Sequence, residues 1–118
     1  MVPFRVRLQV YQGATWVRVL AWKAGTPAVP VDLSGCTARM QVRPRVDSAD
    51  VLLELTTDNG RIVLGGDTGQ VALQLTADET ELLDWRQGVY DLEVEFPGGT
   101  VRRLAQGQIV VSPEVTRG

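Results

Sequence analysis

The chain has 118 residues, of which 44% are hydrophobic and 22% charged, and its net charge is −2. These values are typical of a soluble globular protein, so we expect one domain over residues 1–118. The sequence has no histidine and a single cysteine, which excludes the usual proton shuttle, the commonest metal ligand and an internal disulfide. The acidic balance argues against a nucleic-acid partner. No apolar run approaches the roughly 20 residues that cross a bilayer, so we expect no membrane partner either.

Apolar and polar residues alternate with a period of two along the first half of the chain, the pattern of half-buried strands. We expect strands over residues 4–10, 15–23 and 38–43. One face of the second strand carries small apolar side chains, namely Val17, Val19 and Ala21. Its other face carries large ones, namely Trp16, Leu20 and Trp22. This second face is too apolar to be an ordinary solvent-facing surface.

Turn signals divide the second half into further short strands. We expect strands over residues 51–55, 61–64, 71–75, 90–96 and 100–111. The Asn59-Gly60 pair predicts a tight hairpin turn between the first two of these, since Asn-Gly accepts positive φ at low cost. Thr76 and Glu79 have the spacing of a capping box, which predicts one short helix over residues 77–84. The whole pattern is that of an all-β sandwich with about seven to nine strands.

Candidate catalytic and metal-binding motifs have simpler structural explanations. The glycine-rich segment 65–69 lacks the ending of a phosphate loop and precedes a strand, so we interpret it as a turn. The acidic cluster of residues 78–84 lacks the ligand order of a calcium loop and fits the solvated face of a helix. The carboxylates of Asp91, Glu93 and Glu95 have cross-strand partners in Arg102 and Arg103. We therefore expect no catalytic residues, no metal and no cofactor.

Aromatic and basic residues are the remaining candidates for a binding surface. Five aromatic residues could form a sugar-stacking platform: Tyr11, Trp16, Trp22, Trp85 and Tyr90. Trp16 and Trp22 lie about 20 Å apart along one strand at roughly 3.3 Å per residue, which favours core packing or contact with a partner subunit. Five arginines occupy alternating strand positions and could form one basic face or a solvated surface: Arg5, Arg7, Arg18, Arg39 and Arg43.

Charge is unevenly divided along the chain. Residues 1–50 hold seven basic and three acidic side chains, and residues 51–118 hold five basic and eleven acidic ones. If the two halves interleave in one sandwich, these charges mix. If they do not, the basic face of one molecule could meet the acidic face of a neighbour and favour ordered self-assembly.

The order of these signals resembles a known group of domains. The segments that carry the resemblance are Val-Asp-Leu-Ser-Gly (31–35), Gly-Gln-Val-Ala-Leu-Gln-Leu-Thr (69–76), Gly-Val-Tyr-Asp-Leu-Glu-Val (88–94) and the final Gly-Gln-Ile-Val-Val-Ser-Pro-Glu-Val-Thr-Arg (107–117). Together they look like the small immunoglobulin-like β-sandwich domains of tailed bacteriophages and prophages. They are similar to the N-terminal domains of baseplate upper proteins and to related tail or head-fibre components. No functional residue is carried over by this resemblance.

The resemblance implies an immunoglobulin-like antiparallel sandwich in a non-enzymatic virion protein, made in the cytoplasm of a bacterial host. Its partners would be other phage structural proteins and further copies of itself. We expect contacts through a sheet edge or an exposed apolar, arginine-bearing face, with five candidate residues: Arg5, Arg7, Trp16, Arg18 and Trp22. The alternative is a carbohydrate-binding module that recognises a bacterial surface glycan.

Overall fold

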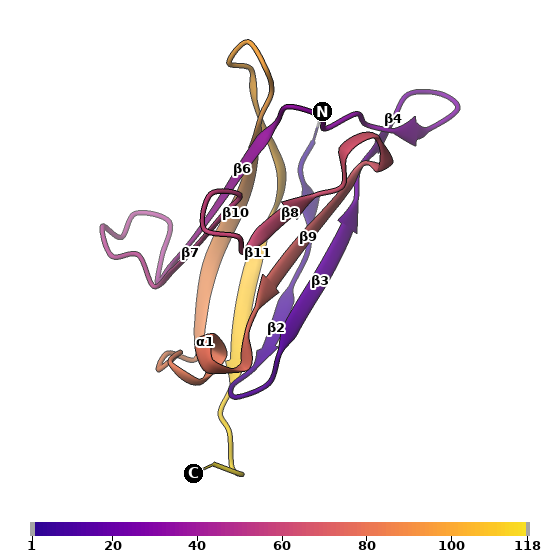
Figure 1. Ribbon diagram of the computed structural model, residues 1–118. Coiled ribbons are helices and arrows are strands. Elements are labelled where there is room, and N and C mark those ends of the chain that lie inside the picture. Colours follow the sequence, from indigo (N-terminus) through magenta and orange to yellow (C-terminus); the bar gives the residue numbers. More distant parts are fainter. Residues whose placement is uncertain (1, 118) are drawn as a thin grey trace.

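The computed structural model describes residues 2–117, which form two stacked β-sheets with their strands along the long axis of the molecule (Figure 1). The larger sheet contains β1 (Phe4–Arg5), β2 (Leu8–Tyr11), β6 (Thr37–Arg43), β7 (Leu53–Thr56), β10 (Gln87–Glu95) and β11 (Val101–Ser112). Its order is β1-β11-β10-β6-β7, and β2 continues the line of β1 along the same neighbour, β11. Both β1 and β2 run parallel to β11, and the other pairs are antiparallel.

The smaller sheet has three strands in the order β3-β9-β8 and is antiparallel throughout. They are β3 (Trp16–Ala21), β8 (Ile62–Leu64) and β9 (Gln70–Leu75). A two-stranded ribbon of β4 (Lys23–Ala24) and β5 (Val29–Pro30) follows β3. A 3-10 turn, η1 (Gly66–Thr68), leads into β9, which confirms the turn predicted for residues 65–69. The predicted all-β sandwich with one short α-helix is confirmed.

The alternating residues of both sheets meet between them and form one core. Along β10, Tyr90, Leu92 and Val94 are buried while Asp91 and Glu93 point outward, as the period of two predicts. The buried set extends over both sheets: Leu8, Val10, Met40, Val42, Leu55, Val71, Leu73, Leu104 and Ile109. Because the chain has one cysteine, no internal disulfide joins the two sheets, and this shared hydrophobic core is the main contact between them.

The helix α1 (Ala77–Glu81) has the predicted capping box. The Thr76 hydroxyl accepts the N–H of Glu79 at 3.1 Å, and the Glu79 carboxylate accepts the N–H of Thr76 at 2.8 Å. The helix ends three residues earlier than predicted, with Leu82 as its C-cap. It lies at the same end of the molecule as the C-terminal segment (Figure 1).

The first predicted strand is broken into two. Between β1 and β2 the Val6 carbonyl turns toward the core and accepts the Tyr90 hydroxyl at 2.6 Å. Opposite this break lies Gly107, where a Cβ atom would stand 2.5 Å from the Val6 oxygen. The sequence pattern alternates without interruption through residues 4–10, so it gives no sign of this break.

The hairpin predicted at Asn59-Gly60 is wrong. β7 pairs with β6 in the larger sheet, whereas β8 pairs with β9 in the smaller one, so the turn carries the chain across the sandwich. Asn59 holds this crossing, because its side-chain oxygen accepts the N–H groups of Thr56 and Arg61 and its side-chain nitrogen donates to the Glu54 carbonyl. Gly60 has the expected positive φ of 78°. The predicted turn at Asn59-Gly60 is confirmed, but the predicted pairing of the strands on either side of it is wrong.

Candidate interaction surfaces

Two of the five predicted contact residues are core residues, which corrects their assignment to a surface. Trp16 is 8% exposed and Trp22 is 1% exposed. The Trp22 ring packs edge-to-face on Phe96, with ring centroids 5.8 Å apart. Their strand face is therefore apolar because it faces the other sheet. Tyr90, a third member of the proposed aromatic platform, is also buried, and this burial raises its pKa to about 12.

The three predicted arginines are exposed but do not share one face. Arg5 lies on β1 and Arg7 on the segment between β1 and β2, both beside the larger sheet. Arg18 lies in the middle of β3, in the smaller sheet. It alternates with the buried residues Trp16 and Leu20, yet its side chain reaches solvent because β3 is an edge strand. The single basic face proposed from the sequence is therefore divided between the two sheets.

The outer face of the larger sheet, called here the charged face, carries acidic and basic side chains side by side. Arg103 lies 3.5 Å from Asp91, and Arg39 lies 3.7 Å from Glu54. The first pair is the cross-strand partnership expected between β10 and β11. Because these side chains are 44% to 64% exposed, each pair contributes little to stability, on the order of 0–1 kcal/mol. The face is a solvated mixture of both charges.

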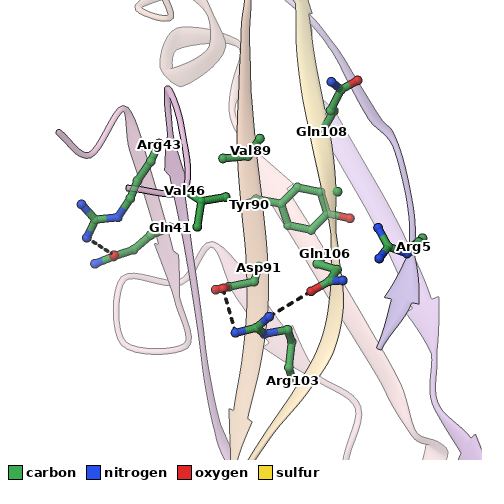
Figure 2. A pocket seen from close by; sticks show the side chains of 11 residues that line it. Arg5, Gln41, Arg43, Val46, Val89, Tyr90, Asp91, Arg103, Gln106 and Gln108 are labelled. Carbon is green, nitrogen blue, oxygen red and sulfur yellow. Dashed lines mark hydrogen bonds and ion pairs between the residues drawn. The ribbon is translucent and has the colours of Figure 1, made fainter. Parts of the chain in front are cut away.

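A hollow of about 490 Å³ opens on the charged face, and Figure 2 shows its lining. Residues of β1, β6, β10 and β11 line the hollow, and they include three arginines: Arg5, Arg43 and Arg103. Two of them are held by neighbours. Arg43 donates to the Gln41 side-chain oxygen at 2.7 Å and to the Ser48 carbonyl at 2.9 Å, and Arg103 donates to the Gln106 side chain at 2.9 Å. The hollow thus offers polar groups suited to hydrogen bonding.

Other candidate chemistry is sparse in the part of the chain that the structure describes. No group of three or more His, Cys, Asp or Glu residues within residues 2–117 is placed to hold a metal ion. Glu79, from the acidic cluster, is occupied by the helix cap and by Arg61, whose Nε lies 2.6 Å away. Cys36 is half-buried against the core, and its pKa is raised by burial and then by the charge of Asp32. No helix among the described residues is long and apolar enough to span a membrane.

The outer face of the smaller sheet has a different character. It is called here the uncharged face and consists of Val17, Val19, Ala21, Val63, Gln70, Ala72 and Gln74. The strand register aligns Val19, Ala72 and Val63 in one apolar row across all three strands. Val17, Val19 and Val63 are 58%, 49% and 48% exposed. None of these seven outward positions is charged. An apolar centre with an amide rim is the composition of a protein–protein contact.

The β3 strand also leaves one edge unpaired. In the described residues β3 pairs only with β9, because β1 and β2 join β11 in the larger sheet instead. β3 is six residues long, contains neither glycine nor proline, and carries Arg18 as its one charge. Long apolar edge strands are templates for further strand pairing. The sequence displayed the alternation of β3 clearly and indicated that the Trp16 face is packed, but it left open whether that face meets the core or a partner subunit.

Comparison with known proteins supports the fold and goes no further. No protein-family model matches the sequence, and no curated protein matches it. Among the solved structures that match is a chicken TCR, with a TM-score of 0.61 and 14% sequence identity. The match covers 100% of this chain and 58% of that chain, so this chain spans little more than half the length of that one. The chain therefore has the predicted immunoglobulin-like sandwich. As in variable-type domains, an additional strand, β7, extends the larger sheet.

Proposed function

We propose that this protein is a non-enzymatic structural module that acts by protein–protein assembly through the uncharged face of its smaller sheet. The observation that carries the proposal is the contrast between the two outer faces. The larger sheet presents paired charges, whereas the smaller one presents exposed valines beside the exposed Ala21 and the half-buried Ala72, with no charge and with a free strand edge. A surface of this kind is costly to leave in water and is typical of a contact area.

The proposed place of this assembly is a bacteriophage or prophage virion, in the tail, the baseplate or a head fibre. This part of the proposal is supported by the resemblance of segments 31–35, 69–76, 88–94 and 107–117 to phage immunoglobulin-like domains. The partners would be other structural proteins of the particle, and the protein would be made in the bacterial cytoplasm. Of the contact residues proposed from the sequence, Arg18 lies on β3 but on the side opposite the uncharged face, and Arg5 and Arg7 lie on or beside β1, away from it.

Incorporation into particles tests the proposal with a matched pair of variants. Val63 and Val101 are both strand valines and are 48% and 52% exposed, but Val63 lies on the uncharged face and Val101 on the larger sheet. Val63→Lys should reduce the amount of protein in purified particles at least tenfold (roughly 1.4 kcal/mol), because a buried lysine opposes apolar contact. Val101→Lys adds the same charge and should be incorporated normally. Equal incorporation of both variants would contradict the assignment of the face.

The hollow on the charged face favours a second candidate function, the binding of a bacterial surface glycan. Gln41, Asp91 and Gln106 place amide and carboxylate groups around it, and such groups hydrogen-bond sugar hydroxyls (Figure 2). Three of the five aromatic rings that the sequence offers for a sugar-stacking platform, Trp16, Trp22 and Tyr90, are buried. A glycan array with the wild type and Asp91→Ala tests this function. Absence of detectable binding of the wild type to cell-wall and capsular sugars would contradict it.

A further inference from the structure

The free edge of β3 has a defined set of unpaired backbone groups. In an antiparallel ladder, the N–H and C=O of successive residues point alternately to the two sides of a strand. The Trp22 N–H donates to the Gly69 carbonyl at 2.8 Å, on the β9 side. By this alternation Leu20, Arg18 and Trp16 direct their backbone groups to β9. The backbone groups of Val17, Val19 and Ala21 therefore point to the open side.

The opposite strand supports this assignment. The Gln74 N–H donates to the Arg61 carbonyl at 2.9 Å, so Gln74 and Ala72 direct their backbone groups toward β8. Val71, Leu73 and Leu75 then face β3, where their register partners are Leu20, Arg18 and Trp16. Three N–H and three C=O groups thus remain on the free edge, and they belong to the same residues whose side chains lie on the uncharged face.

We propose that this edge pairs with the β3 edge of a second copy of the chain, antiparallel and about a two-fold axis through Val19. This inference rests on the proposed function and names one partner of the same surface. The two copies would form a continuous six-stranded sheet in the order β8-β9-β3-β3-β9-β8. A two-fold contact of this kind is closed, so it yields a dimer and not an open fibre.

The sequence of β3 selects one register for this pairing. With Val19 opposite Val19 of the second copy, Val17 faces Ala21 and all three residues of each edge can pair, which gives six hydrogen bonds. Arg18 then lies opposite Leu20. A shift of the two-fold axis to residue 18 would place the two Arg18 side chains directly opposite each other, and like charges in that position are destabilising. A shift to residue 20 leaves Val17 opposite Lys23, outside β3.

Self-pairing also explains the composition of the edge. A foreign strand would have to supply its own matching apolar row, whereas a second copy supplies it by symmetry: Val17–Ala21, Val19–Val19 and Ala21–Val17. The rows of the two smaller sheets become one uncharged surface on the dimer. Because the strands pair antiparallel and lie along the long axis, the C-terminal ends of the two copies point in opposite directions (Figure 1).

Cysteine cross-linking tests both the partner and the register. In a Cys36→Ser background, single Val19→Cys should form an intermolecular disulfide on mild oxidation, since directly opposed residues lie about 5.5 Å apart at Cα, within disulfide range. Single Val17→Cys should not, because its own copy would lie about 13 Å away at roughly 3.3 Å per residue. A mixture of Val17→Cys and Ala21→Cys should cross-link as a heterodimer. All three side chains are exposed, so the fold should tolerate these changes.

The mass of the wild type by light scattering should be twice the 12.9 kDa of one chain. Equal cross-linking of Val17→Cys and Val19→Cys, or a monomeric mass without any cross-link, would overturn the self-pairing. The proposed function is tested separately, because Val63 lies on β8 and away from the β3 edge. A monomeric protein that Val63→Lys still excludes from particles would overturn the dimer and leave the assembly face standing.

Discussion

At the scale of single residues, Glu79 joins the helix cap to the smaller sheet. Its carboxylate accepts the Thr76 N–H and lies 2.6 Å from Nε of Arg61, which also donates to the Glu54 carbonyl. The backbone hydrogen bond from Thr76 is the largest cause of its lowered pKa. Burial, the second cause, opposes it, and Arg61 lowers the pKa further. Glu79 therefore connects the capping box of α1, through Arg61, to the segment in which the chain crosses from β7 to β8.

This lowered pKa predicts a pH-dependent part of the stability. Because the folded state holds Glu79 ionised below its ordinary pKa of about 4.5, the stabilisation is complete above that value and is lost as the pH falls through the lowered folded pKa. Glu79→Gln keeps a capping side chain but removes the charge, so it should cost about 1 kcal/mol near neutral pH. The difference from the wild type should shrink as the pH falls below about 4.5 and through the lowered folded pKa, measured in denaturant titrations.

Asp78→Asn is the matched control, because it removes a charge from the same helical turn. No hydrogen bond to the Asp78 side chain is present within residues 2–117, so its effect should be smaller than that of Glu79→Gln. A Glu79→Gln penalty that stays constant while the carboxylate becomes protonated in acid would show that the ion pair and cap do not carry the stabilisation.

At the scale of elements, the break between β1 and β2 depends on Gly107. Its φ of 154° and the 2.5 Å approach of a would-be Cβ to the Val6 oxygen leave no room for a side chain. Gly107→Ala should force β1 away from β11 and disturb the Tyr90–Val6 hydrogen bond. We expect a loss of about 2–3 kcal/mol in unfolding free energy, measured by chemical denaturation.

Gly98→Ala is the control that distinguishes the steric clash at Gly107 from the strain of a positive φ. Gly98 also has a positive φ, 96°, but a Cβ there would meet no atom within 4 Å. Its substitution should cost only about 1–2 kcal/mol, the price of a left-handed conformation. Hydrogen exchange should show loss of protection at residues 4–6 for Gly107→Ala alone, and similar exchange in both variants would refute the role of the close approach.

Much of this element arrangement follows from local sequence signals. The alternation of residues 90–96 and the capping box of Thr76 and Glu79 depend on neighbouring residues, and both were predicted correctly. The sheet to which each strand belongs depends on contacts distant in sequence, so Asn59-Gly60 looked like a hairpin although it is a crossing. The same limit applies to β3. Its two faces are both apolar, and the size of the Trp16 face indicated packing without telling the core from a partner subunit. The position of the larger sheet places Trp16 inside and Val19 outside.

At the scale of the whole molecule, the uneven charge of the chain reappears as a difference between faces and not between its two halves. β6, from the basic first half, lies between β10 and β7 of the acidic second half, and its Arg39 pairs with Glu54 of β7 within the same sheet. The smaller sheet stays free of charge on its outer side. Two modes of self-association are therefore physically distinct: ionic contact through the charged face, or apolar contact and strand pairing through the smaller sheet.

Salt distinguishes these two modes. Ionic contact between exposed charges weakens steeply as the Debye length falls from about 10 Å at 0.1 M to about 3 Å at 1 M salt. Apolar contact and backbone pairing carry no such dependence, and sulfate strengthens them. We therefore expect the dissociation constant, from sedimentation at several protein concentrations, to change less than about twofold between 0.1 and 1 M NaCl, and to fall in sodium sulfate. Dissociation in 1 M NaCl would instead assign the contact to charged side chains, such as those of the charged face, and not to the uncharged face.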